Sequence, residues 1–275
     1  MKTEYYKEYS QNLGRDMEFK VYGHSGRPFL VFPSQDGRFF DYENNGMINA
    51  AKDYIESGRI QMFCCDSNDV NSWSSTSWDN RNRILQQEAY MRYITDELCP
   101  RIFDINAKAN NGTYAKGIMT TGCSMGGTHA LNSLLRRPDI FAGCIALSGA
   151  YNARLFFADY WDDLVYANSP VDYLEGMHYD DPKVEMYRHR DIIVCCGRGA
   201  WEVPMQEDAG RIKELLEYKN VPAWVDFWGT DVAHDWPWWR KQLPYHLRLW
   251  EIKNGVRLEQ IISRDFLPWD YKVCF

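Results

Sequence analysis

Short apolar runs separated by longer amphipathic stretches constrain the fold of this chain more than any other feature. The runs are rich in β-branched and aromatic residues, as buried strands are, and the stretches between them place apolar residues at helical spacing. The expected strands are residues 19–22, 29–32, 60–65, 117–121, 143–147, 192–196 and 223–228, and the expected helices are residues 45–55, 80–103, 126–135, 205–218 and 238–252. This alternation is typical of a mainly parallel sheet with helices on both faces. The sequence therefore predicts an α/β fold, in a single domain over residues 1–275.

Two segments depart from the alternation. Residues 151–187 are rich in tyrosine and aspartate and follow the expected strand 143–147. We expect them to form an insertion that covers one end of the sheet as a cap or lid. Residues 257–275 are too apolar for a free tail, and we expect them to pack on the domain.

Charge and composition exclude several classes of function. The formal net charge of -7 is spread along the chain without a basic stripe, so nucleic acid is not an expected partner. No run approaches the roughly 18 apolar residues of a membrane-spanning helix, and the first residues lack the apolar core of a signal peptide. We therefore expect a cytoplasmic protein with no membrane partner. No G-x-G-x-x-G motif follows the first strand, which argues against a dinucleotide-binding oxidoreductase.

The cysteines indicate a reduced protein interior. Two adjacent pairs, Cys64/Cys65 and Cys195/Cys196, lie within expected strands, where neighbouring side chains point to opposite faces of the sheet. Buried, reduced thiols are the simplest interpretation. A zinc site is the alternative, but no Cys-x-x-Cys or histidine-rich spacing supports it. We therefore expect neither a metal nor a cofactor.

One short motif predicts chemistry. Residues 122–126 have the sequence Gly-Cys-Ser-Met-Gly, which matches G-x-S-x-G, and they lie between an expected strand and an expected helix, as this motif requires. Such a sharp turn strains the serine and exposes its hydroxyl at the carboxyl edge of the sheet. The N-terminus of the following helix points its amides at the position where negative charge develops during attack on a carbonyl. The motif predicts that Ser124 is a nucleophile.

The motif and its surroundings resemble a known family. Gly-Cys-Ser-Met-Gly-Gly-Thr-His-Ala-Leu at 122–131, Arg-Pro-Asp-Ile-Phe at 137–141 and Ser148-Gly149 are similar to the putative-esterase family of α/β-hydrolases. That family includes esterase D (S-formylglutathione hydrolase), feruloyl esterases and the antigen 85 mycolyltransferases. The resemblance extends from about Phe29 to the helix after His234 and implies an α/β-hydrolase fold acting on small carboxylic esters or thioesters. Cys123 departs from esterase D, which typically has histidine there, and this weakens the case for a formylglutathione substrate.

A serine hydroxyl needs a base, which in this fold is a histidine on the loop after the last strand. His234 follows the expected strand 223–228 and precedes a helix, so it is the predicted base. The other histidines lie in less suitable places: His24 before the core strands, His129 in the helix after the motif, His178 and His189 in the insertion, and His246 in the last helix.

The acid that orients the histidine should follow the preceding strand. Glu202 lies in the loop after the expected strand 192–196 and is the predicted acid, whose role is to fix the tautomer of His234 and stabilise its imidazolium. Most family members carry aspartate at this place. Asp208 and Glu207 in the next helix and Asp231 near the base are the alternatives.

Two backbone amides are expected to form the oxyanion hole. One belongs to Met125, which follows the nucleophile. By similarity to the family, in which the second donor follows a His-Gly or Asp-Gly pair, Pro33 and Ser34 occupy that pair and Gln35 is the donor, with Ser34 as the alternative. Trp73, in the loop after strand 60–65, is the candidate wall of the substrate pocket. The alternative is that the tryptophans near the site form a packed loop core.

These residues favour a carboxylesterase in which water releases the acyl group from Ser124. An acyltransferase would use the same triad with an alcohol in place of water, and the sequence does not separate the two. A catalytically silent binding protein would have a broken triad, so the presence of Ser124 and His234 counts against it. The sequence leaves open whether the chain forms a homo-oligomer.

Overall fold

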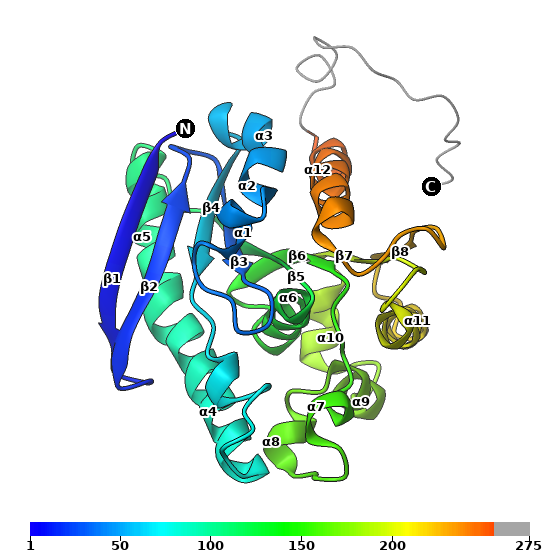
Figure 1. Ribbon diagram of the computed structural model, residues 1–275. Helices are drawn as coiled ribbons and strands as arrows, with labels where there is room; N and C mark the ends of the chain where they lie inside the picture. Colours follow the sequence, from blue (N-terminus) through cyan, green and yellow to red (C-terminus); the bar gives the residue numbers. More distant parts are fainter. Residues whose placement is uncertain (256–275) are drawn as a thin grey trace.

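An eight-stranded sheet forms the centre of the molecule, in the order β1-β2-β4-β3-β5-β6-β7-β8 (Figure 1). The computed structural model describes residues 1–255. The strands are β1 (Thr3–Ser10), β2 (Arg15–Tyr22), β3 (Arg27–Phe32), β4 (Ile60–Cys65), β5 (Ile118–Cys123), β6 (Phe141–Leu147), β7 (Asp191–Cys196) and β8 (Ala223–Phe227). The first two strands pair antiparallel with each other and β2 pairs antiparallel with β4, whereas all pairs from β4 to β8 are parallel. The predicted α/β class is confirmed.

Helices follow most strands. They are α1 (Asp41–Asn44), α2 (Met47–Ala50), α3 (Lys52–Glu56), α4 (Asn80–Arg92), α5 (Cys99–Ala109), α6 (Met125–Arg136), α7 (Arg154–Phe157), α8 (Asp163–Tyr166), α9 (Pro170–Gly176), α10 (Pro182–Tyr187), α11 (Val203–Tyr218) and α12 (Trp236–Lys253). A short 3-10 helix, η1 (Asp69–Asn71), follows β4, and a π-helical segment, η2 (Tyr93–Leu98), joins α4 to α5.

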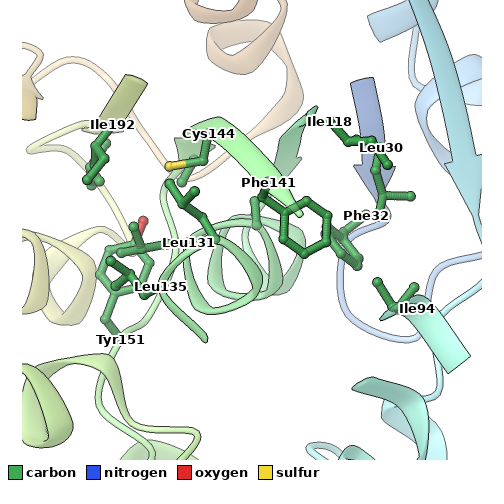
Figure 2. Close-up of a cluster of buried hydrophobic side chains, with 14 of the residues drawn as sticks. Leu30, Phe32, Ile94, Ile118, Leu131, Leu135, Phe141, Cys144, Tyr151 and Ile192 are labelled. Carbon is green, nitrogen blue, oxygen red and sulfur yellow. The ribbon is translucent and has the colours of Figure 1, made fainter. Parts of the chain in front are cut away.

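Each face of the sheet has its own apolar core, because successive strand residues point to opposite faces. On one face the strands pack against α4, α5, α6 and α11, and Figure 2 shows Leu131 and Leu135 of α6 facing strand residues of this core. On the other face they pack against α1, α2, α3 and α12. The pairs Cys64/Cys65 and Cys195/Cys196 each divide between the two cores, as the sequence predicts. The seven cysteines among the described residues are all free and buried.

The structure differs from the predicted elements at three places. The hairpin of β1 and β2 extends the sheet at one edge, although β1 is too polar on both faces to be recognised as a strand. The helix expected at 45–55 is divided into α2 and α3, and Gly46, at a φ of 74°, separates α2 from the preceding α1. The long helix expected at 80–103 contains the π segment η2 just before Pro100, where the missing N–H and the bulk of the proline ring disfavour regular α-helix.

The carboxyl ends of β3 to β8 lie at one edge of the sheet, where ligands bind in folds of this kind. The segment 151–187 contains α7 to α10 between β6 and β7; its action as a lid stays a prediction, as does the single-domain assignment. The packing predicted for residues 257–275 lies outside the described residues. Within residues 1–255, no helix combines the length and apolar character that crossing a membrane requires.

Candidate active site

Ser124 occupies the turn between β5 and α6 in a strained backbone conformation. Its φ of 57° and ψ of -125° are uncommon for a residue with a side chain, and Ser124 is partly exposed while Cys123 and Met125 are buried. Its amide donates to the carbonyl of Leu147 at 2.9 Å, which ties the turn to the end of β6. The strain therefore presents the hydroxyl at the carboxyl edge of the sheet.

His234 lies within hydrogen-bond distance of this hydroxyl. Its Nε2 is 2.9 Å from Ser124 Oγ. The backbone amide of His234 donates to the carbonyl of Ala200 at 2.9 Å, and the ring of Trp239 packs edge-on against the imidazole with centroids 4.9 Å apart. This geometry allows His234 to accept the proton of Ser124.

Glu202 lies on the other side of the imidazole, at the end of the loop after β7. Its side chain is 0% exposed, and its Oε2 is 3.5 Å from His234 Nδ1. Neither of these two atoms has a hydrogen-bond partner within the described part of the chain. A buried carboxylate is costly without hydrogen bonds or a facing charge, so the position of Glu202 is suited to orienting the imidazole that it faces.

Two residues that the sequence analysis gave no role in the site connect to the carboxylate of Glu202. The hydroxyl of Ser148 donates to Glu202 Oε1 at 2.6 Å, and Trp239 Nε1 donates to Ser148 Oγ at 3.0 Å. Ser148 follows β6 at the same edge of the sheet as the nucleophile and has a φ of 51°. Its place after a core strand is the signal that sequence inspection could have used.

The alternative acids either have other hydrogen-bond partners or are exposed. Asp208 Oδ2 accepts hydrogen bonds from the amides of Tyr151 and Asn152 at 2.6 and 2.9 Å, so it anchors the start of the segment 151–187. Burial raises the pKa of Asp208. Glu207 and Asp231 are exposed. Of the four candidates, only Glu202 has a carboxylate oxygen near His234 among the ion pairs of residues 1–255.

The acid and base loops contact each other directly. The amide of Gly199 donates to the carbonyl of Val232 at 2.9 Å. A Cβ on Gly197 would overlap the same carbonyl, so only glycine permits this approach. The loops after β7 and β8 are thus packed together, which sets the separation of Glu202 and His234.

The region expected to form the oxyanion hole lies against the nucleophile turn. A Cβ on Gly126 would overlap the carbonyl oxygens of Phe32 and Pro33, so α6 begins in contact with the loop after β3. The amide of Ser34 donates to Asp41 Oδ2 at 2.9 Å and is therefore occupied. The amides of Gln35 and Met125 donate to no group among residues 1–255. Of the two residues considered for the second donor, Gln35 is the one whose amide is free.

A buried polar contact connects α6 to the loop after β3, and no sequence pattern indicated it. His129 Nε2 is 2.8 Å from Asp69 Oδ1, and the two side chains are 1% and 0% exposed. The other carboxylate oxygen of Asp69 accepts from the amide of Asp36 at 3.4 Å. Asp36 follows Gln35 and has a φ of 58°. Asp69 therefore joins α6, which begins directly after Ser124, to the residue after Gln35.

Trp73 is part of a packed cluster rather than an open wall. It is 2% exposed, its indole Nε1 donates to Gln87 Oε1 at 2.9 Å, and its ring contacts Phe156 and Phe157. The cluster also includes Met125, beside the nucleophile. This burial favours the alternative of a packed loop core; contact between Trp73 and substrate stays a prediction.

Comparisons with known proteins give a family and several similar folds. A family model described as putative esterase matches residues 10–249. The structure is similar to a ferulic acid esterase (16% identity, TM-score 0.66, covering 90% of this chain and 97% of that chain). It is also similar to S-formylglutathione hydrolase from Staphylococcus aureus (14%, TM-score 0.59, 90% and 96%) and to MPT51 of Mycobacterium tuberculosis (14%, TM-score 0.62, 94% and 100%). A search of curated proteins returned no match. At these identities the structural similarities establish the α/β-hydrolase fold alone.

Proposed function

The chain belongs to the putative esterase family, and on this premise we propose that it is a serine hydrolase that cleaves a carboxylic ester or thioester through an acyl-enzyme on Ser124. The family predicted from the motif is confirmed. The observation that carries the proposal is the 2.9 Å contact between His234 Nε2 and the hydroxyl of Ser124 at a strained strand-to-helix turn. A serine in this position is activated by the adjacent base.

In the proposed first half-reaction, Ser124 Oγ attacks the carbonyl carbon while His234 Nε2 takes its proton. Glu202 stabilises the resulting imidazolium from the Nδ1 side. The amides of Met125 and Gln35 donate to the oxyanion of the tetrahedral intermediate, and one such donor is typically worth about 2.7–4 kcal/mol of barrier. The bond to the leaving alcohol or thiol then breaks, and His234 protonates the leaving group.

In the second half-reaction, water replaces the leaving group. His234 accepts a proton from the water as it attacks the acyl-enzyme carbonyl, and the acid is released when the bond to Ser124 Oγ breaks. The hydroxyl of Ser124 recovers its proton from the imidazolium, so the cycle needs no cofactor.

We also propose that the substrate is a small molecule and that the protein works in a reducing compartment. The seven described cysteines are free and buried, which is typical of proteins kept in the cytoplasm, where thiols stay reduced. We therefore place the activity there.

The proposal is tested with a fluorophosphonate probe, mass mapping of the adduct, and hydrolysis of p-nitrophenyl esters of graded chain length. We expect the adduct on Ser124, turnover of at least the short esters, and loss of both in Ser124→Ala. Ser57→Ala is the control. It changes an exposed serine that lies well before Ser124 in the sequence, and the variant should retain both the adduct and turnover. A folded protein that gives neither adduct nor turnover would instead indicate a silent binding protein.

A further inference from the structure

Three potential metal ligands meet between the sheet and α12, on the face away from α6. Cys195 of β7 and Asp226 of β8 are direct partners in the parallel register, and His246 of α12 lies against them. One ligand atom from each residue lies within 4.8 Å of the other two. Figure 1 shows how α12 packs beside the ends of β7 and β8. Sulfur, oxygen and nitrogen donors from three separate elements therefore converge at one point.

Unsatisfied polar atoms surround this point. His246 is 0% exposed, and neither of its ring nitrogens has a hydrogen-bond partner in the described structure. Gln242 lies one helical turn earlier on the same face of α12, is equally buried, and also lacks partners for both its amide nitrogen and its amide oxygen. Each unsatisfied buried group costs about 1–3 kcal/mol, so a native fold is expected to provide these atoms with a partner.

The surrounding side chains orient the ligands. The ring of Trp224 packs edge-on against the imidazole of His246 with centroids 4.8 Å apart, and Trp228 lies on the same side at 6.5 Å. Trp228 Nε1 donates to Asp226 Oδ2 at 2.9 Å. A hydrogen bond to a carboxylate ligand, within an apolar shell, is the kind of support that metal sites receive from the residues around them.

We propose that Cys195, Asp226 and His246 bind a zinc ion that stabilises the fold. Zinc takes thiolate, imidazole and carboxylate ligands at about 2.0–2.3 Å, which places neighbouring ligand atoms of a tetrahedral site about 3.3–3.8 Å apart. His246 Nε2 and Asp226 Oδ2 are 3.7 Å apart, and the sulfur of Cys195 is within 4.8 Å of both. Small side-chain rotations complete the geometry. Hard cations such as Mg²⁺ and Ca²⁺ are disfavoured because they prefer oxygen ligands.

The fourth ligand is the amide oxygen of Gln242 or a water molecule. The uncommitted amide of Gln242 is the nearest such group along the helix face. Cys195 and His246 are 0% exposed and the side chain of Asp226 is 22% exposed, so the site is largely enclosed and its role is structural. It joins β7, β8 and α12, and the last two of these flank the loop that carries His234.

Metal content and spectroscopy test this proposal without reference to catalysis. We expect the full-length protein from zinc-supplemented growth to contain one zinc per chain by plasma mass spectrometry. Replacement of zinc by Co²⁺ should give a thiolate-to-cobalt charge-transfer band and the strong visible bands of a tetrahedral ion. Chelation should lower the unfolding temperature, and zinc should restore it.

Variants then identify the ligands. Cys195→Ser and His246→Gln should each lose at least about 100-fold in zinc affinity, because even supporting residues contribute 10–100-fold. Cys196→Ser changes a buried thiol on the opposite face of the sheet and should keep the metal and the cobalt spectrum. If a ligand variant does not fold, the cobalt spectrum of the unaltered protein still reports whether a thiolate binds. A protein that takes up neither zinc nor cobalt, or a charge-transfer band that survives in Cys195→Ser, overturns the proposal.

Discussion

At the scale of single residues, the environment of Glu202 differs from that of an ordinary surface carboxylate and suits a residue that positions His234. It is fully buried, it accepts one strong hydrogen bond from Ser148, and its other oxygen faces only the imidazole of His234. A charged group in such a place requires a compensating charge. In the proposed reaction, the imidazolium formed when Ser124 loses its proton supplies that charge in the transition state, so the burial of Glu202 would favour it.

Glu202→Gln is therefore expected to lower kcat by about 10³ to 10⁴-fold, as the loss of the acid does in comparable triads. The amide keeps the shape of the side chain and an acceptor for Ser148, so the fold should persist. Initial rates on a p-nitrophenyl ester and circular dichroism measure the two effects. Glu207→Gln, at an exposed position of α11, the helix that follows Glu202, serves as the control and should retain the rate. If Glu202→Gln retained full turnover and Asp231→Asn lost it, the acid would be Asp231.

At the scale of elements, the nucleophile turn depends on close contact between α6 and the loop after β3. Gly126→Ala would place a Cβ into the carbonyl oxygens of Phe32 and Pro33, and these backbone atoms can yield only if the loop moves away. We expect turnover to fall at least about 100-fold, because a displacement of about 1 Å at an active site has such an effect. Rates and thermal unfolding measure the loss.

Gly210→Ala is the matched substitution for this prediction. Gly210 lies within α11, and a Cβ there would meet no atom within 4 Å. Alanine should raise the free energy of unfolding by about 0.4–1 kcal/mol and leave turnover unchanged. Equal turnover in Gly126→Ala and Gly210→Ala would show that the contact with the β3 loop does not position the catalytic groups.

The contact between α6 and Asp69 gives a second prediction at this scale. The carboxylate of Asp69 accepts from the amide of Asp36 with one oxygen and lies 2.8 Å from His129 with the other. Asp69→Asn leaves only one acceptor oxygen, so the side chain can no longer accept both from the amide of Asp36 and from an N–H of His129. We expect kcat to fall about tenfold with KM nearly unchanged, a fraction of the loss caused by removing an oxyanion donor outright. Lower stability with an unchanged kcat would instead indicate a purely structural contact.

The sequence was sufficient for the parts of this arrangement that depend on strand order. Ser124, Glu202 and His234 each follow a core strand, and parallel strands bring their carboxyl ends to one edge, so the structure places the three side chains together. Ser148 shares this signal, because it follows β6, whereas the contacts of Trp239 in α12 and Asp69 in η1 depend on tertiary packing that no local pattern encodes. The break at Gly46 and the π segment before Pro100 have local signals, a glycine and a proline, which the expected helices 45–55 and 80–103 overlooked. The cluster of Cys195, Asp226 and His246 comes from three distant segments, so no motif spacing could reveal it.

At the scale of the whole molecule, the ion pair between Glu88 of α4 and Arg136 of α6 also contacts Asn168 of the segment 151–187. Glu88 of α4 accepts from Arg136 of α6 through both carboxylate oxygens, at 2.6 and 2.9 Å, and from Asn168 at 2.6 Å. Burial raises the pKa of Glu88, but the hydrogen bonds and positive charge of Arg136 and the bond from Asn168 outweigh it, so the pKa lies below its usual value. This contact fixes the segment to the rest of the fold.

Because the pKa of Glu88 is lower in the folded state than its unfolded value of about 4.3, ionised Glu88 stabilises the fold above that pH, and the contribution is lost as the pH falls through the folded pKa. Glu88→Gln should therefore lower the free energy of unfolding by about 1–3 kcal/mol at neutral pH. Urea unfolding of both proteins should show the difference shrinking below about pH 4. Glu185→Gln, which removes an exposed partner of Arg188, should have little effect at neutral pH. A difference between Glu88→Gln and the unaltered protein that stays constant with pH would mean that the substitution acts through packing rather than through the charge of Glu88.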